Sequence, residues 1–233
     1  MTKPLSETDF VRSVMELRPA TAVFDCDGTL WPEDAGTLFM EWTLAQRMVA
    51  PDRAEWIADR HARYRRGLVA QDVICGEMTA VYAGLREDEL RARARECYRE
   101  QIAPHVFPEM KRLVETLRDG GAEIWAVSST NVQMIEAALE DFGIPPEKIL
   151  ATRVACNDGV MTENLLAVPT GAGKREALAQ AGVTGDYAAF GNSIHDAAML
   201  ASARWPFAVN PNLDLLQLAE ERGWPVYWPH RLN

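Results

Sequence analysis

The sequence predicts an α/β protein in which helices flank a parallel sheet and an all-helical segment is inserted after the first strand. Beyond residue 103, short apolar runs typical of buried strands alternate with amphipathic segments, as in parallel strands joined by helices. Between residues 36 and 103, apolar residues recur at helical spacing and strand-like runs are almost absent. We therefore expect residues 1–35 and 104–233 to form the α/β core and residues 36–103 to form a helical cap.

Local patterns predict the elements before and within the cap. An amphipathic pattern predicts a helix over residues 6–17, and an apolar run predicts the first strand over residues 21–24. Pro51 indicates the start of a cap helix, and Gly67 and Gly84 indicate breaks between helices. We expect three to five helices in the cap.

Beyond the cap, helices and strands are expected in turn. The expected helices cover residues 109–118, 133–142, 173–181, 191–201 and 212–221. The expected strands cover residues 123–127, 148–155, 160–163, 187–190 and 207–209. Asn157, Asp158 and Gly159 separate two of these strands and are typical of a tight hairpin turn.

The composition is that of an ordinary globular protein, with 48% hydrophobic and 25% charged residues in a chain of 233. We expect a cytoplasmic protein without a membrane partner, because no apolar run has the length of a signal peptide or a membrane span. The net charge of −10 argues against a nucleic-acid partner. The scattered cysteines predict free thiols. The sequence leaves the oligomeric state open.

Polar side chains gather at the ends of three predicted strands. Asp25 and Asp27 follow the first strand, residues 128–131 (Ser-Ser-Thr-Asn) follow the second, and Asn192 and Asp196 follow a later one. An isolated Asp-x-Asp-Gly is often only a turn. The carboxyl ends of parallel strands meet at one edge of a sheet, however, and ligands bind there. The recurrence of polar clusters at these ends therefore indicates a functional site, and its paired carboxylates favour a hard cation.

The polar clusters resemble, in order and spacing, the four motifs of the haloacid dehalogenase superfamily of phosphatases. The first motif is Phe24-Asp-Cys-Asp-Gly-Thr-Leu30, and the second is the strand that ends in Ser128. The third is Lys174 in Gly-Ala-Gly-Lys-Arg, and the fourth is Gly191-Asn-Ser-Ile-His-Asp196. The helical insertion is similar to the cap of the phosphoserine-phosphatase-like branch. The resemblance implies a Rossmann-like core and covers nearly the whole chain.

By this resemblance, four residues are expected to be catalytic. Asp25 would be the nucleophile that forms an aspartyl-phosphate, and Asp27 would be the general acid and later the general base. Ser128 would hold a phosphoryl oxygen, and Lys174 would offset the charge of Asp25 and phosphate. The substrate would be a small phosphomonoester.

The resemblance also implies a phosphate-binding set and a metal set. Ser129, Thr130 and Asn131 are expected to bind the phosphoryl group at the N-terminus of the helix that follows them. The expected cofactor is Mg²⁺, which favours oxygen ligands. Its predicted residues are Asp25, Asp27 (through its main-chain carbonyl), Asn192 and Asp196, the last in the inner or the second shell.

Two positions of these motifs bear on the activity. Dehalogenating members of the superfamily lack the second aspartate of the first motif, so Asp27 favours phosphoryl chemistry. The fourth motif departs from the usual Gly-Asp, since Asn192 stands where a metal-binding aspartate is expected. The neutral amide should hold Mg²⁺ more weakly. Two hypotheses follow: a working Mg²⁺-dependent phosphatase, or a catalytically weak relative that only binds a phosphorylated ligand.

Residues near the cap indicate the substrate class. Asp34, next to Glu33, lies where related phosphatases carry an acidic residue that meets the substrate's amino group, so an amine-bearing phosphomonoester is expected. Both phosphoserine-like and phosphocholine-like substrates remain open. Aromatic residues could form part of a choline cage or belong to the core: Trp31, Phe39, Trp42, Trp56 and Tyr64. Basic residues could meet a substrate carboxylate or form a solvated face: Arg60, Arg63, Arg65 and Arg66. His195 is interpreted as a loop side chain.

Overall fold

A computed structural model describes residues 5–230, which form ten α-helices and one sheet. The helices are α1 Glu7–Leu17, α2 Ala35–Ala45, α3 Pro51–Tyr64, α4 Gln71–Ala80, α5 Glu87–Cys97, α6 Pro108–Asp119, α7 Val132–Leu139, α8 Ala172–Gln180, α9 Ala197–Ser202 and α10 Leu213–Arg222. The strands are β1 Thr21–Phe24, β2 Glu123–Asn131, β3 Ile149–Asn157, β4 Val160–Ala167, β5 Ala188–Gly191, β6 Trp205–Val209 and β7 Val226–Tyr227. No helix of this described part is both long and apolar enough to cross a bilayer.

The sheet has the order β4-β3-β2-β1-β5-β6-β7 and is parallel except for β4, which pairs antiparallel with β3. Strand β1 lies at the centre, between β2 and β5. The chain runs outward from β1 to one edge through β2 and β3 and then returns to the other side through β5. The carboxyl end of β1 therefore lies at a topological switch point, where parallel sheets bind ligands.

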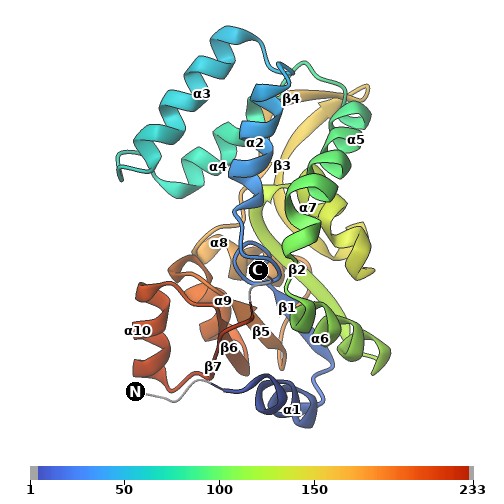
Figure 1. Ribbon diagram of the computed structural model, residues 1–233, viewed down its shortest axis with the longest axis vertical. Helices are drawn as coiled ribbons and strands as arrows, with labels where there is room; N and C mark the ends of the chain where they lie inside the picture. Colours follow the sequence, from blue (N-terminus) through green and yellow to red (C-terminus); the bar gives the residue numbers. More distant parts are fainter. Residues whose placement is uncertain (1–4, 231–233) are drawn as a thin grey trace.

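Alternation along the strands places apolar side chains on both faces of the sheet. Ala22 and Phe24 of β1 join one core cluster with residues of α1, α6 and α7. Val23 joins the other cluster with residues of α8, α9 and α10. The sheet is thus covered by helices on both sides (Figure 1), and the short strand β1 is fully buried beyond its first residue. This confirms the predicted fold class.

Helical structure between β1 and α6 extends from Ala35 to His105. It comprises α2 to α5, followed by a π-helical turn and a 3-10 turn. These bounds lie within two residues of the expected cap, whose separation as a domain stays a prediction. The β3–β4 hairpin reaches this insertion (Figure 1): Gly84 N donates to Met161 O at 2.8 Å, Met161 N to Leu85 O at 2.9 Å, and Glu87 N to Gly159 O at 2.9 Å.

The structure differs from the expected elements mainly at three strands and one helix, α9, which begins at Ala197 and not at residue 191, after a 3-10 turn over Ile194–Asp196. Strand β2 runs on through Ser128 to Asn131, although its pairing with β1 ends at Ala126. Strand β4 is longer than expected, and the short edge strand β7 was not predicted. The hairpin turn is confirmed, since Asp158 and Gly159 both have positive φ as a type I′ turn requires. The four cysteines are free thiols, as expected.

Candidate active site

The loop after β1 holds Asp25 at the carboxyl edge of the sheet. The Asp25 amide donates to the Phe190 carbonyl of β5 at 2.9 Å, and its Oδ2 accepts from Thr29 Oγ1 at 2.9 Å. Gly28 has φ +77°, and a Cβ there would lie 1.8 Å from Nδ2 of Asn192. Glycine therefore lets the loop after β1 approach the loop after β5 closely.

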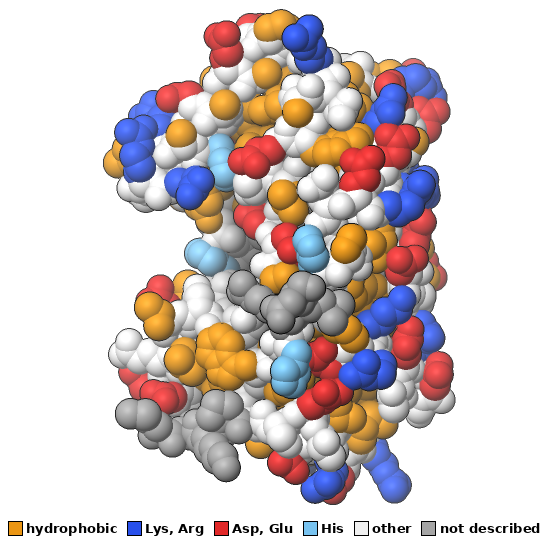
Figure 2. Space-filling view, in the orientation of Figure 1, with side chains coloured by type: hydrophobic (Ala, Val, Ile, Leu, Met, Phe, Trp, Pro, Cys, Tyr) orange, Lys and Arg blue, Asp and Glu red, His pale blue; other side chains and the backbone are white. Residues whose placement is uncertain are grey.

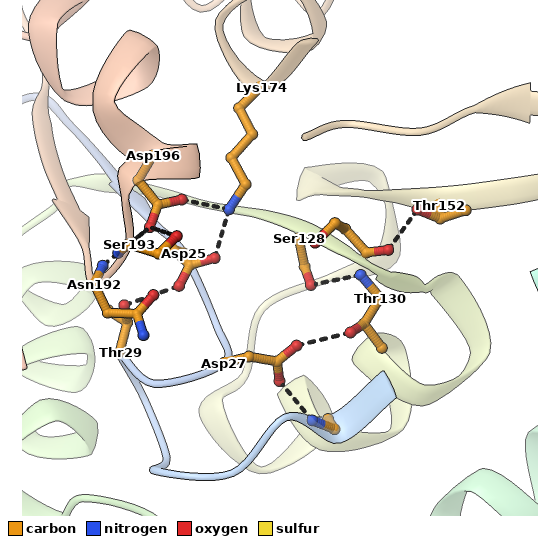
Figure 3. A network of polar contacts seen from close by, with 12 residues as sticks. Asp25, Asp27, Thr29, Ser128, Thr130, Thr152, Lys174, Asn192, Ser193 and Asp196 are labelled. Atoms are coloured by element: carbon orange, nitrogen blue, oxygen red, sulfur yellow. Dashed lines mark hydrogen bonds and ion pairs between the residues drawn. The ribbon is translucent and has the colours of Figure 1, made fainter. Parts of the chain in front are cut away.

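Lys174, from α8, joins these two loops through a buried ion-pair triad (Figure 3). Its Nζ donates to Oδ1 of Asp25 at 2.5 Å and to Oδ1 of Asp196 at 2.6 Å. The Lys174 and Asp196 side chains are 3% and 0% exposed, so the ammonium is shielded from water. Oδ2 of Asp196 accepts from the amides of Asn192 and Ser193 at 3.0 and 2.9 Å. Asp196 thus fixes both Lys174 and the loop that carries Asn192.

The electrostatics of this triad favour a cation. Burial, and then the charge of Asp196, raise the pKa of Asp25, whereas Lys174 opposes the rise. Burial alone would lower the pKa of Lys174, but the two carboxylates outweigh it and the pKa lies above its usual range. Two carboxylates face one ammonium in the triad, so ionisation of both leaves an excess of negative charge. A bound cation would offset that charge and keep Asp25 ionised.

Asp27 points away from the triad toward β2 and the start of α2 (Figure 3). Its Oδ1 accepts from Trp31 Nε1 at 2.8 Å and from the Ala35 amide at 3.1 Å, and its Oδ2 accepts from Thr130 Oγ1 at 2.7 Å. Burial, followed by the charge of Asp34, raises the pKa of Asp27 to about 6. A carboxyl group with that pKa can give and take a proton near neutral pH.

The end of β2 supplies the remaining predicted residues. Ser128 is 1% exposed, and its Oγ accepts from the Thr130 amide at 3.1 Å. Asn131 caps α7 by accepting from the Met134 amide at 2.9 Å. Ser129, Thr130 and Asn131 line the cavity described below. Ser128 is not among the lining residues, and its hydrogen bond from the Thr130 amide holds the backbone at the end of β2 that the other three residues present.

The donor set fits a hard metal ion. Asp25 and Asn192 lie on the loops after the neighbouring strands β1 and β5, and both line the cavity. Their carboxylate and amide oxygens are ligands that Mg²⁺ prefers, and the main-chain carbonyl of Asp27 offers a third oxygen. Asp196 differs from the other three predicted metal residues, because it is fully buried behind Lys174 and is not among the residues that line the cavity. No group of three or more His, Cys, Asp or Glu side chains within residues 5–230 forms a metal site by itself.

A cavity of about 220 Å³ connects this edge of the sheet with the helical insertion. It contains Asp25, Asp27 and Lys174 at one end and residues of α2, α3 and α4 at the other. Figure 2 shows the molecule hollowed between these two parts, with histidine side chains beside the hollow. The lining includes residues that the sequence did not predict for the site: Thr37, His61, Gln71, Ile74, Cys75, Met78 and Thr79. They carry no motif, and only the fold brings them together.

The acidic residues near the start of α2 have different partners. Asp34 caps α2, with Oδ1 accepting from the Thr37 amide and Oδ2 from the Thr37 hydroxyl, both at 2.8 Å. Oε1 of Glu33 faces His105 Nδ1 at 2.8 Å. Oε2 of Glu33 is buried and has no hydrogen-bond partner in the part of the chain that the structure describes, and the same is true of Oε1 of Gln71. Both residues line the cavity.

Most of the aromatic and basic residues considered from the sequence lie outside the cavity. Of the five aromatic residues only Tyr64 lines it. Trp31 and Phe39 are core residues, Trp42 bonds to Glu100, and Trp56 is 45% exposed. No arginine lies among its lining residues within the described chain. His195 does line the cavity, and burial lowers its pKa.

Known proteins resemble this chain in sequence. The model of the haloacid dehalogenase-like hydrolase family matches residues 22–201. The chain is 31% identical over 218 residues to a histidinol-phosphatase from Neisseria meningitidis, which covers 88% of this chain and 96% of that protein. It is 27% identical over 165 residues to a phosphoserine phosphatase from Mycobacterium tuberculosis, covering 67% of this chain and 53% of that protein.

Solved structures share the fold. A Bordetella pertussis protein of unknown function superposes with a TM-score of 0.79 and 25% identity, covering 89% of this chain and 97% of that one. A substrate-bound phosphoserine phosphatase superposes with a TM-score of 0.61 and 14% identity, covering 90% and 92% of the two chains. Both similarities extend across the helical insertion as well as the sheet.

Proposed function

The chain is a phosphatase of the haloacid dehalogenase-like hydrolase family, and we propose that it is a Mg²⁺-dependent phosphomonoesterase that acts through an aspartyl-phosphate on Asp25. The observation that carries the proposal is the buried triad, in which Lys174 Nζ lies 2.5 Å from Asp25 and 2.6 Å from Asp196. In this triad the Asp25 carboxylate is held beside the Lys174 ammonium at the carboxyl end of β1, where both line the cavity. A phosphate dianion requires such positive charge beside its nucleophile.

The two aspartates of the first motif divide the chemistry. A carboxylate oxygen of Asp25 attacks phosphorus, the bond to the ester oxygen breaks, and Asp27 protonates the departing alkoxide. Asp27 then removes a proton from the water that attacks the phospho-aspartate, and phosphate and free Asp25 are released. The three hydrogen bonds to Asp27 and its pKa of about 6 support this role.

The other site residues bind and orient. Ser129, Thr130 and Asn131 would present the backbone at the N-terminus of α7 to the phosphoryl oxygens, and Ser128 would hold that backbone in shape. Asp25, Asn192 and the Asp27 carbonyl would hold Mg²⁺. When bound, the ion offsets negative charge on the phosphoryl group. Asp196 would position Lys174 and the Asn192 loop, because its oxygens bind those groups and it does not line the cavity.

We propose an amine-bearing substrate without a carboxylate. Glu33 and Asp34 bring negative charge to the cavity next to the start of α2, and Glu33 Oε2 has no hydrogen-bond partner within the described chain. No arginine that would bind a carboxylate lies among the described lining residues, which disfavours phosphoserine. Tyr64 is the only one of the five aromatic residues in that lining and does not form a choline cage alone. L-histidinol phosphate carries an ammonium and no carboxylate, and it agrees with the name of one relative.

Steady-state hydrolysis of L-histidinol phosphate, O-phosphoethanolamine, phosphoserine and phosphocholine tests the proposal. We expect turnover that needs Mg²⁺, falls to background after chelation and in Asp25→Asn, and favours the first two esters. Acid quenching should trap phosphate on the wild-type protein and none on Asp25→Asn. Tight binding of an ester without turnover of any would instead support the catalytically weak binder.

A further inference from the structure

A chain of hydrogen bonds in the insertion ends at a histidine that lines the cavity. Asp34 at the start of α2 accepts from the Thr37 hydroxyl at 2.8 Å, and Thr37 Oγ1 lies 3.2 Å from Nε2 of His61 on α3. His61 is 8% exposed, and its ring centroid lies 6.1 Å from that of Tyr64. The chain thus joins two helices and holds the imidazole in one orientation.

The direction of these bonds determines the tautomer of His61. A threonine hydroxyl has one proton, and Thr37 donates it to the carboxylate of Asp34. His61 Nε2 must then donate to Thr37 Oγ1, so the geometry selects the Nε2–H tautomer, in which Nδ1 is a hydrogen-bond acceptor. The insertion therefore fixes a hydrogen-bond acceptor on a cavity-lining residue.

Two other cavity-lining residues carry buried acceptors. Glu33 Oε2 and Gln71 Oε1 have no hydrogen-bond partner within residues 5–230, and Lys174 is the only lysine or arginine among the described lining residues. A buried acceptor without a partner is costly, and a ligand that supplies a donor removes that cost. These acceptors therefore fit a ligand that carries more than one N–H donor.

We propose that His61 is a specificity-determining residue, positioned by Thr37 and Asp34, that binds a second N–H donor on the substrate beyond its ammonium group. The inference rests on the proposed function, since it concerns the same site. The substrate class is a phosphomonoester with an amine near the ester and a flat N–H-bearing ring further away. Tyr64, Ile74 and Met78 supply apolar and aromatic surface for such a ring.

The test compares two esters that differ in the second donor. L-Histidinol phosphate has an ammonium and an imidazole, whereas O-phosphoethanolamine has the ammonium alone. His61→Phe keeps a ring beside Tyr64 and removes the acceptor. We expect it to lower kcat/KM for L-histidinol phosphate about tenfold, mainly through KM, and to change that for O-phosphoethanolamine less than about twofold. Equal losses on both esters, or no loss on either, would overturn the proposal.

Two further variants separate positioning from folding. Thr37→Val removes the hydroxyl that orients His61 and should cause part of the same selective loss, which Thr37→Ser should restore. Arg65→Ala, a change at the exposed C-cap of α3, is the matched control and should leave both esters unaffected. Failure of Thr37→Ser to restore what Thr37→Val loses would contradict the positioning chain.

Binding distinguishes failure of this inference from failure of the proposed function. In the Asp25→Asn protein, calorimetry measures the affinity for L-histidinol phosphate without turnover. If adding His61→Phe to Asp25→Asn weakens the affinity, the recognition role is supported. This holds even if the wild-type protein hydrolyses neither ester, and only the proposed reaction is then wrong. Unchanged affinity on adding His61→Phe, or no binding by Asp25→Asn, overturns the inference.

Discussion

The two ends of the cavity satisfy their polar groups in different ways. At the sheet end, both carboxylate oxygens are hydrogen-bonded in each of three residues: Asp25, Asp27 and Asp196. At the insertion end, Glu33 and Gln71 keep buried oxygens that have no partner within residues 5–230. The sheet end is thus organised before any substrate arrives, as electrostatic catalysis requires. The insertion end keeps unpaired acceptors, as the proposed recognition of N–H donors requires.

The largest effect should come from Asp27→Asn at the sheet end. In single-turnover experiments we expect leaving-group release from an alkyl phosphate to slow by about 10²–10⁴-fold, because the alkoxide then leaves without a proton. Release from p-nitrophenyl phosphate should slow much less, because p-nitrophenolate needs no proton. The matched control is Cys26→Ala, a buried side chain between the two aspartates. Equal slowing with both leaving groups would contradict the acid role.

A smaller effect is expected at the metal ligands. Asn192→Asp adds a charged oxygen donor, so the Mg²⁺ concentration for half-maximal activity should fall on the order of tenfold. Asn192→Leu removes the donor and should raise that concentration. Titration of activity with Mg²⁺ at saturating substrate measures both. An unchanged midpoint in both variants would show that Asn192 does not touch the metal.

At the insertion end the effect should depend on the substrate. Glu33→Gln keeps the size of the side chain and removes its charge. We expect KM for O-phosphoethanolamine to rise about tenfold, with little change for an uncharged alkyl phosphate. Asp34→Asn is the variant to compare with it, because the Asp34 carboxylate already accepts two hydrogen bonds from Thr37 as the cap of α2. A larger selective loss in Asp34→Asn would move the ammonium site to that residue.

The smallest effect is expected for the basic run on α3. Arg60 pairs with Glu77 of α4 through two hydrogen bonds, at 2.8 and 2.7 Å, and does not line the cavity. Arg60→Ala should therefore change kcat/KM for phosphoserine less than about twofold. A selective loss for phosphoserine would show that Arg60 does reach a substrate carboxylate, and the proposed substrate class would then be wrong.

The sheet end could be anticipated from the sequence, because its residues follow strands at fixed offsets. The position of Asp25 depends on a four-residue strand, and Lys174 and Asp196 belong to motifs with their own spacing. The sequence does not show how those side chains are oriented in the site. That both Asp196 oxygens are engaged follows from the turn at residues 192–196, where the backbone amides point at the carboxylate.

The insertion end could not be anticipated in the same way. His61 and Gln71 lie on amphipathic helices whose pattern reports which face is buried and not what that face meets. Tyr64 lines the cavity, whereas Trp42 and Trp56 do not, although all three lie on helices in which apolar residues recur at helical spacing. Strand β7 was missed because two residues give no periodicity. Helix packing over the sheet decides these outcomes.

The main-chain bonds between segment 84–87 and the hairpin have a consequence for access to the site. The insertion joins the core at its two chain ends, and these bonds attach it at a third place, next to the hairpin turn. A segment that is attached at three separate places cannot rotate as one rigid body. Helix α4 packs against β3 and β4 as well, so α4 and α5 are both attached to the hairpin, and bending that admits substrate or frees phosphate is expected between α3 and α4. The speed of product exit would then depend on residues 65–70, which connect these two helices.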